Sequence, residues 1–232
     1  MTMREAIERV TERGALLPGL SDQEIANLET SLTMAVPPDV RALLQFSAGL
    51  KVKNFETVQF AGYAGFEFTE AFPRSVALVP DRFGNYWIVD INSETGAWGA
   101  VFFVCHDPPV VVVQAHDLAE FILQISDFAA TEIESALRSI QQDAVDKIWK
   151  YDPWLITRDE ADKGSDPLLS NFARKLPKDF RVVDLRSLEI GSGFSWGSAN
   201  GKIIRAEANL IFGVETKPLP LLKRLVTGRK VK

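Results

Sequence analysis

The sequence predicts an α+β fold in which helices enclose a run of short strands within the first 150 residues. Apolar residues recur at helical spacing up to residue 47, and this spacing returns after residue 117. Between these regions, apolar runs of strand length alternate with turn residues. Hydrophobic residues make up 46% of the 232 residues and charged residues 25%, which is enough apolar material for a sizeable core.

Three helices are predicted before residue 50. The first is a charged amphipathic stretch over 3–13. Ser21 begins the second as its N-cap, because a glutamate three residues later completes the capping-box pattern. The third helix covers 39–47 and follows Pro38, a residue that suits the first helical turn.

Short strands joined by turns are predicted from Thr57 onward. The clearest cover 76–79, 86–92, 101–105 and 110–115. The last two are apolar at nearly every position, so we expect both of their faces to be covered. A four-residue turn between them would place Cys105 opposite Val112.

Two further helices are predicted after the strands. Asp117 caps the first and Thr131 caps a longer second helix, which ends before Asp152; each cap has a glutamate three residues later. The stretch 157–166 holds six charged residues and a glycine in ten positions. This composition predicts a linker or an exposed loop.

Residues 1–150 are predicted to form one domain, and residues 151–232 a C-terminal extension that packs on it. About 80 residues with one hairpin and a short helix make a marginal core by themselves. The last part of the extension, 217–232, is a basic amphipathic segment with six basic and no acidic residues.

The hairpin of the extension is predicted from its turn. Asn200-Gly201 suits a type I′ turn, because both central residues of that turn need a positive φ. The flanking strands would cover 192–198 and 202–214. A further strand is predicted over 180–185.

The charge balance excludes some classes of protein. The formal net charge is −5, and the 20 basic and 31 acidic residues before Lys217 give that part a net charge of −11. This argues against a dedicated nucleic-acid binder, which needs a surplus of Lys and Arg. No stretch reaches the roughly 18 consecutive apolar residues of a membrane-spanning helix, and the first residues lack a secretory apolar run. We therefore expect a cytoplasmic protein without a membrane span.

No catalytic residue, metal site or cofactor is predicted. The single cysteine, Cys105, excludes an internal disulfide and a thiolate-only zinc site. Cys105 and His106 are neighbours on one strand and point to opposite faces, while His116 lies roughly 13 Å further along the face of Cys105. Neither a Cys–His dyad nor a two-histidine metal site is expected, so the sequence predicts a protein that is not an enzyme.

Several short motifs follow one another in a specific order and spacing. They are Leu20-Ser21 with Glu24-Ile25, Glu29, Leu32, Pro37 or Pro38, Asp39-Val40, Leu43-Leu44-Gln45-Phe46 before Gly49, Asp81, Gly84-Asn85, Trp87-Ile88-Val89-Asp90, Gly99-Ala100-Val101, His106-Asp107, and Asp117-Leu118-Ala119-Glu120-Phe121-Ile122. Over roughly residues 15–130 this order resembles the SUKH superfamily, specifically its Smi–Knr cell-wall-regulator branch. One departure is Ser47-Ala48-Gly49, where the family usually has an Asn-Gly pair.

The resemblance implies a domain with helices packed on an antiparallel sheet, and a binding role without shared catalytic residues. Bacterial relatives look like immunity proteins that neutralise polymorphic or contact-dependent toxins, often nucleases or deaminases. Fungal relatives look like regulatory scaffolds for cell-wall synthesis.

We therefore expect a bacterial immunity protein that acts in interbacterial competition. Its partner would be a cognate toxin domain, and a basic nuclease-like toxin would match the acidic surface. A regulatory scaffold in cell-wall metabolism is the alternative interpretation. A third interpretation is an enzyme that acts through the C-terminal part of the chain.

Partner binding is predicted at an acidic and aromatic edge around the sheet. The residues of this edge are Glu67, Glu70, Asp81, Glu94 and Trp98. All five lie on predicted turns or strand ends, where side chains can reach a partner without disturbing the core. Of the five tryptophans, Trp98 is the most available to a partner, while Trp87 and Trp149 are expected to pack.

Overall fold

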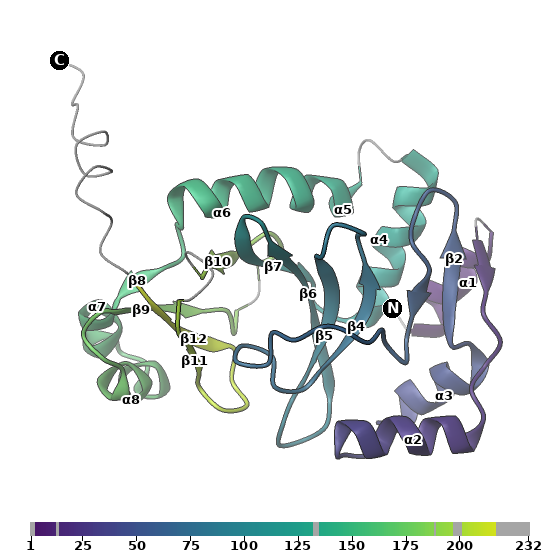
Figure 1. Ribbon diagram of the computed structural model, residues 1–232, viewed down its shortest axis with the longest axis horizontal. Helices are drawn as coiled ribbons and strands as arrows, with labels where there is room; N and C mark the ends of the chain where they lie inside the picture. Colours follow the sequence, from purple (N-terminus) through teal and green to yellow (C-terminus); the bar gives the residue numbers. More distant parts are fainter. Residues whose placement is uncertain (1–2, 13, 132–134, 188, 197–200, 217–232) are drawn as a thin grey trace.

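The computed structural model describes residues 3–12, 14–131, 135–187, 189–196 and 201–216 (Figure 1). The helices are α1 (Met3–Thr11), α2 (Asp22–Leu32), α3 (Pro38–Phe46), α4 (Leu118–Thr131), α5 (Ala136–Ser139), α6 (Val145–Tyr151), α7 (Arg158–Lys163) and α8 (Pro167–Lys175), with a π-helical segment, η2 (Ile140–Ala144), between α5 and α6. The strands are β1 (Gly14–Leu16), β2 (Gly49–Val52), β3 (Val58–Gln59), β4 (Ser75–Pro80), β5 (Tyr86–Ile91), β6 (Trp98–His106), β7 (Pro109–Ala115), β8 (Ile156–Thr157), β9 (Phe180–Asp184), β10 (Gly193–Ser195), β11 (Ile203–Arg205) and β12 (Ile211–Glu215).

Within the described residues the strands form three antiparallel sheets, and the largest lies near the centre of the molecule (Figure 1). Its order is β10-β7-β6-β5-β4, and the smaller sheets have the orders β1-β2-β3 and β11-β12-β9-β8. Helices α4 to α6 lie along one side of the central sheet, while α2 and α3 lie at the opposite end of the molecule from α7 and α8 (Figure 1). The predicted α+β fold with antiparallel sheets is confirmed.

The local signals at the first helices act as predicted. The Ser21 hydroxyl accepts a hydrogen bond from the Glu24 amide, and the Glu24 carboxylate accepts one from the Ser21 amide at 2.7 Å. This capping box satisfies two amide donors that would lack partners at a helix start. Pro38 occupies the first turn of α3, as predicted.

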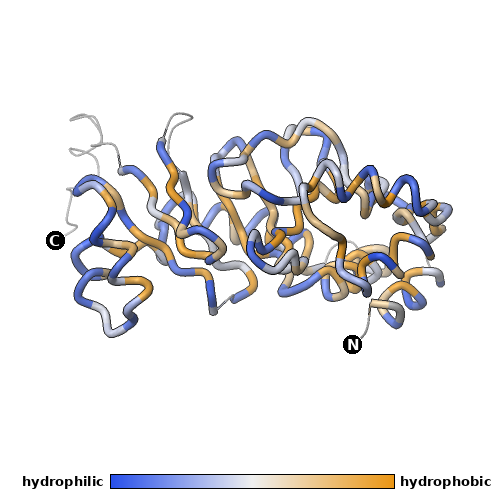
Figure 2. Tube along the Cα trace, turned by 90° about the horizontal axis from the view of Figure 1, so that it is seen from below, coloured by the Kyte–Doolittle hydropathy of each residue, from blue (hydrophilic) through white to orange (hydrophobic). Residues whose placement is uncertain are grey.

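Two hydrophobic cores meet at the central sheet, one on each face. On β6, Val101 and Phe103 face the core shared with α1 to α6. Phe102 and Val104 face the second core, which the extension shares. The prediction that both faces of β6 and β7 are covered is confirmed, and Figure 2 shows hydrophobic residues along the strands with hydrophilic residues at the bends.

The predicted register between β6 and β7 is wrong by two residues. Cys105 pairs with Val110, because β7 already begins at Pro109 and the connection consists of Asp107 and Pro108 alone, whose peptide bond is cis. A shift of two keeps every side chain on its face. Cys105 and His106 therefore still point to opposite faces of the sheet, as predicted.

The helix predicted to begin at Thr131 begins later. Thr131 is the last residue of α4, which continues past its predicted end because Phe128 also packs against the first core. The N-cap of α5 is Ser135, whose hydroxyl accepts a hydrogen bond from the Arg138 amide. Residues 132–134 lie outside the described part.

The tryptophans expected to pack behave differently from one another. Trp87 is buried at 2% exposure, whereas Trp149 is 46% exposed. Val145 and Ile148 are the buried residues of α6, so the helix turns Trp149 away from the sheet.

The charged stretch predicted as a linker contains helix α7. Thr157 caps this helix, and Thr157 and Glu160 form a second capping box. Ala161 is fully buried and packs α7 against a third core, which lies between α8 and the four-stranded sheet β11-β12-β9-β8. The number of charged residues did not indicate this helix. One capping box and one buried alanine are enough to form it and pack it against the core.

The predicted hairpin has different strands. β10 pairs with β7 of the central sheet, and the hairpin is formed by β11 and β12. The stretch read as one long strand turns over 206–210, where the Asn209 amide donates to the Ala206 carbonyl and Glu207 has a φ of 48°. Asn200, part of the predicted turn, lies outside the described residues.

The extension contacts the central sheet in three ways. Phe194 of β10 lies opposite Val111 of β7, and Phe212 of β12 is buried in the second core. Arg205 of β11 forms an ion pair with Asp90 of β5, at 2.7 and 2.8 Å, with both side chains at least nine-tenths buried. These contacts tie the extension to the sheet, while a domain boundary after residue 150 stays a prediction.

Candidate protein-binding surface

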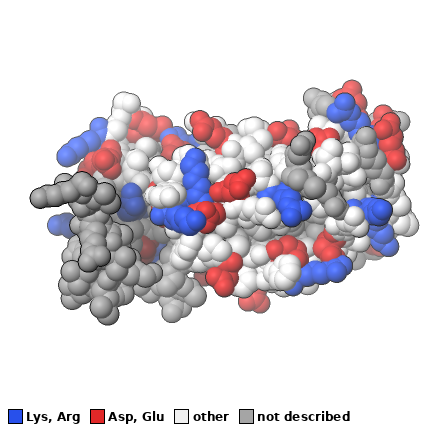
Figure 3. Space-filling view, turned by 90° about the horizontal axis from the view of Figure 1, so that it is seen from above, with Lys and Arg blue, Asp and Glu red and all other residues white. Residues whose placement is uncertain are grey.

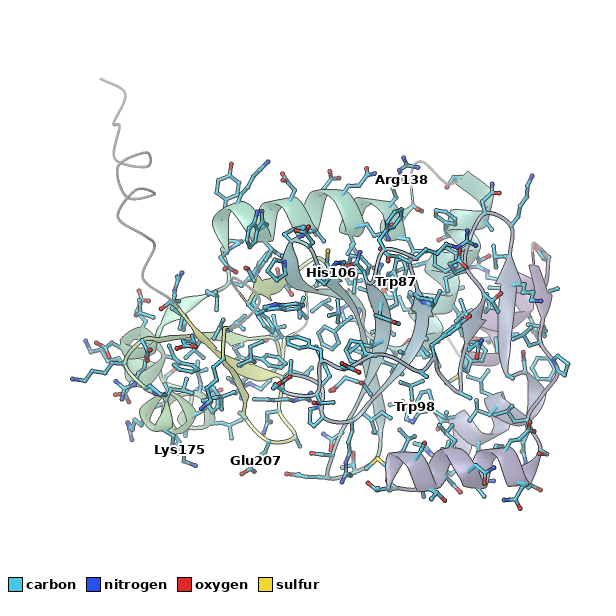
Figure 4. All side chains as sticks on the ribbon, in the orientation of Figure 1. Trp87, Trp98, His106, Arg138, Lys175 and Glu207 are labelled. Atoms are coloured by element: carbon cyan, nitrogen blue, oxygen red, sulfur yellow. The ribbon has the colours of Figure 1, made fainter. Side chains whose placement is uncertain are left out.

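Four of the five residues predicted to bind a partner lie at the two ends of the central sheet. Strand β5 connects the turn of Asp81 to the turn of Glu94, and its six residues separate these turns by about 17 Å. Glu67 lies near the end of Asp81, and Trp98 begins β6 at the end of Glu94. Trp98 and His106 are the first and last residues of β6, and Figure 4 labels both.

Glu70 lies apart from both groups. It is exposed and precedes Ala71, whose carbonyl accepts a hydrogen bond from Arg205. The structure therefore brings Glu67 and Asp81 toward one end of the sheet and Glu94 and Trp98 toward the other.

A surface groove lies at the end of the sheet marked by His106. We call it the aromatic groove; its volume is about 250 Å³ and its lining residues are Gly65, Phe66, Glu67, Phe68, Gly84, Tyr86, Val104, His106 and Trp196. The rings of Phe68 and Trp196 lie 4.2 Å apart between centroids, and those of Phe66 and Tyr86 lie 5.6 Å apart. The extension thus supplies one wall of the groove through Trp196.

Hydrogen bonds beneath the groove hold His106 in place. Asp81 accepts bonds from the amides of Phe83 and Asn85, at 2.8 and 3.0 Å, and from the side-chain amide of Asn85. This fixes the Asn85 oxygen toward His106, where it accepts from the backbone amide and lies 2.9 Å from ring Nδ1. Because that oxygen can only accept, the contact suits a ring Nδ1 that donates to it, and the bond fixes the orientation of the imidazole.

Asp81 therefore has a positioning role in the turn, in addition to the partner contact predicted for it. Its carboxylate orders the turn that carries Phe83, and Phe83 is 80% exposed. A large aromatic side chain held in the solvent by an ordered turn is typical of an interface anchor. Sequence reasoning missed Phe83, although its place between Asp81 and Gly84 is a turn signal.

The charge beside the groove is acidic. Glu67 is exposed in its wall, and Asp107, next to His106 in the chain, is exposed as well. The cation of this turn, Arg82, forms an ion pair with Glu56. Basic and acidic side chains are instead interspersed on the face seen in Figure 3, from the side of α5 and α6.

The single cysteine and the two histidines lie in different surroundings. Burial raises the pKa of the Cys105 thiol, which leaves it a poor nucleophile. His116 follows β7 at the opposite end of the sheet from His106, and its Nδ1 lies 2.7 Å from the Glu120 carboxylate. Within the described ranges, no three His, Cys, Asp or Glu residues form a group that could hold a metal ion, and no helix there is long and apolar enough to cross a membrane.

Asp152 holds the strand that carries Trp196. This carboxylate follows α6 and accepts a hydrogen bond from the Ser195 amide at 3.0 Å. Burial raises its pKa to about 6, against the lowering effects of that bond and of Arg181. The folded protein therefore binds this proton more tightly than the unfolded chain does.

Asp152→Asn is expected to remove a pH dependence of stability. A raised pKa makes the folded state most stable below pH 4, and this contribution is lost as pH rises to about 6. Asparagine still accepts from Ser195 and tolerates the positive φ of 45°. We expect equal stability of variant and wild type at pH 4 and a variant more stable by about 1–3 kcal/mol at pH 8. Urea unfolding at both pH values measures this, and an equal difference at both would contradict it.

Aromatic side chains at a protein's surface, as in the aromatic groove, are enriched in protein interfaces. Residues 19–124 match the family model of the SMI1 / KNR4 family (SUKH-1). The resemblance to the SUKH superfamily is thereby confirmed over this segment, from the turn before α2 into α4. No curated protein matches the chain.

The family match supports a protein-binding role of an immunity-like or regulatory kind, since members are generally non-catalytic proteins of these two types. Trp196 lies outside the matched residues. The aromatic groove thus combines a wall from the family segment with a wall from the extension.

Proposed function

We propose that this protein is a cytoplasmic immunity protein that binds and neutralises a cognate toxin domain in interbacterial competition. The aromatic groove carries the proposal, because it combines half-buried aromatic side chains, and the exposed Phe83 next to Gly84 of its lining, with acidic side chains at one end of the sheet. The family match over residues 19–124 supports a protein as the partner.

The groove suits a basic partner. Nucleases hold phosphate in basic clefts, so acidic residues such as Glu67 and Asp107 would accelerate the encounter with a nuclease-like toxin. Phe83 and Trp196 would then anchor the complex and block access to the toxin's active site. Neutralisation by this mechanism is steric and requires no reaction.

The test is a binding measurement with the product of the neighbouring reading frame. Surface plasmon resonance at two salt concentrations should show a stable complex whose association rate falls as salt rises. Glu67→Lys with Asp107→Lys should slow association by about tenfold and weaken its salt dependence, since charges at the rim act mainly on the association rate. Glu207→Lys, an exposed charge on the β11–β12 turn, is the matched control and should change nothing.

Two results would redirect this assignment. A complex whose association rate does not depend on Glu67 and Asp107 would contradict binding at the groove. A neighbouring product that binds without being a toxin, and that acts in wall synthesis, would favour the regulatory scaffold.

A further inference from the structure

A second surface groove lies at the far end of the sheet, away from the aromatic groove. It consists of two hollows of about 220 and 390 Å³ that share Met3 and Asp39. Leu43 and Phe46 line the first, and Trp98 lines the second. We call it the helical groove, because α1, α3 and the start of α4 border it.

The helical groove is apolar with an acidic border. Phe46 is 56% exposed, although it belongs to the face of α3 that also carries the buried Leu43. The charged residues among the described lining are Asp39 and Asp117. Arg41, the nearest cation along α3, is held by Glu29 at 2.7 Å. A fitting ligand has an apolar face flanked by positive charges.

The sequence of this chain contains a segment with those properties. Residues 217–232 carry six basic and no acidic residues. Leu221, Leu222 and Leu225 recur at the spacing of one helix face, with Lys223 and Arg224 between them. We propose that residues 217–232 of a second copy of this chain dock in the helical groove.

The place where the segment begins favours a second copy over the same chain. The Thr216 amide donates to the Asp179 carbonyl, which places the start of the segment beside β9. In Figure 1, β9 lies in the left part of the view, and Figure 4, in the same orientation, labels Trp98 in the right half. Leu221 follows Thr216 by five residues, a reach of about 17 Å even when fully extended. The leucines of one copy thus meet the groove of another.

Sedimentation velocity of the full-length chain tests the proposal. We expect the sedimentation coefficient to rise with concentration, and an excess of free peptide of residues 217–232 to reverse the rise. Phe46→Ser and Asp39→Lys should each weaken self-association at least tenfold; both side chains are exposed, so the fold is preserved. Tyr151→Ser, which alters an even more exposed aromatic on α6, should leave self-association unchanged.

Replacing Leu221, Leu222 and Leu225 with serine separates apolar docking from general charge attraction. This variant keeps all six basic residues, so we expect it to be monomeric at every concentration. A monomeric wild type, or self-association that survives the leucine or Phe46 substitutions, would overturn the proposal. No toxin enters the experiment, so its outcome is independent of the proposed immunity function.

Discussion

Arg205→Ala is expected to lower the free energy of unfolding by about 3–5 kcal/mol. The guanidinium donates two hydrogen bonds to Asp90, a third to the Ala71 carbonyl and a fourth to the Asn209 carbonyl, the last two at 3.0 Å. Its removal leaves the Asp90 carboxylate in the second core without this partner, and a buried charge without its partner is strongly destabilising. Because stabilities of whole domains are typically about 5–15 kcal/mol, urea unfolding will resolve the change easily.

The control is an ion pair at the surface. Lys150→Ala breaks the exposed pair with Asp146, at 2.7 Å, and should cost at most about 0.5 kcal/mol. Replacing both Asp90 and Arg205 by apolar residues should cost less than Arg205→Ala alone, because no charge is then left buried. A cost for Arg205→Ala no larger than that for Lys150→Ala would show that the extension is not held by this pair.

Trp196→Ala and Phe83→Ala are expected to weaken partner binding by about 2 kcal/mol each, or about 30-fold in affinity. Phe83 is 80% exposed, so its loss affects the complex and not the fold. Trp196 packs on Phe68, and its loss removes one wall of the groove. The effect should fall on the dissociation rate, in contrast to the charge reversals.

Two controls separate binding from folding. Tyr151→Ala removes a 75% exposed aromatic from α6 and should leave the affinity unchanged. Urea unfolding of Trp196→Ala shows whether the fold survives, and Phe83→Ala remains informative if it does not. Unchanged dissociation rates in both Trp196→Ala and Phe83→Ala would place the interface elsewhere.

Signals that act within a few residues predicted the first two thirds of the fold well. The Ser21 capping box and the apolar runs of β6 and β7 act on neighbouring residues or on both faces of one strand. The same kind of signal was present at Thr157 and Glu160, and the charge count around it led to the wrong prediction of a linker.

Pairing between distant strands could not be predicted in the same way. Nothing in the residues of β10 indicates that it pairs with β7 instead of β11, because this choice depends on the edge that the rest of the fold leaves open. The register of β6 and β7 depended on a two-residue connection where a four-residue turn was expected.

In the candidate site too, contacts between distant parts of the chain could not be predicted from the sequence. Glu67 was predicted from its place in a turn, and it does line the aromatic groove. Trp196 could not be assigned to the groove, because only the folded chain brings it to Phe68. The sequence predicts both Asp81 and Glu94 to lie in turns, but β5 separates the two turns and places them at opposite ends of the sheet.

Titration of the toxin's activity tests the central claim most directly. The toxin domain from the neighbouring reading frame is held at fixed concentration while full-length chain is added, and its activity is measured at each step. We expect activity to fall in proportion to added chain and to reach background at one chain per toxin, with Phe83→Ala requiring a large excess. Full activity in the presence of excess wild-type chain would contradict the account.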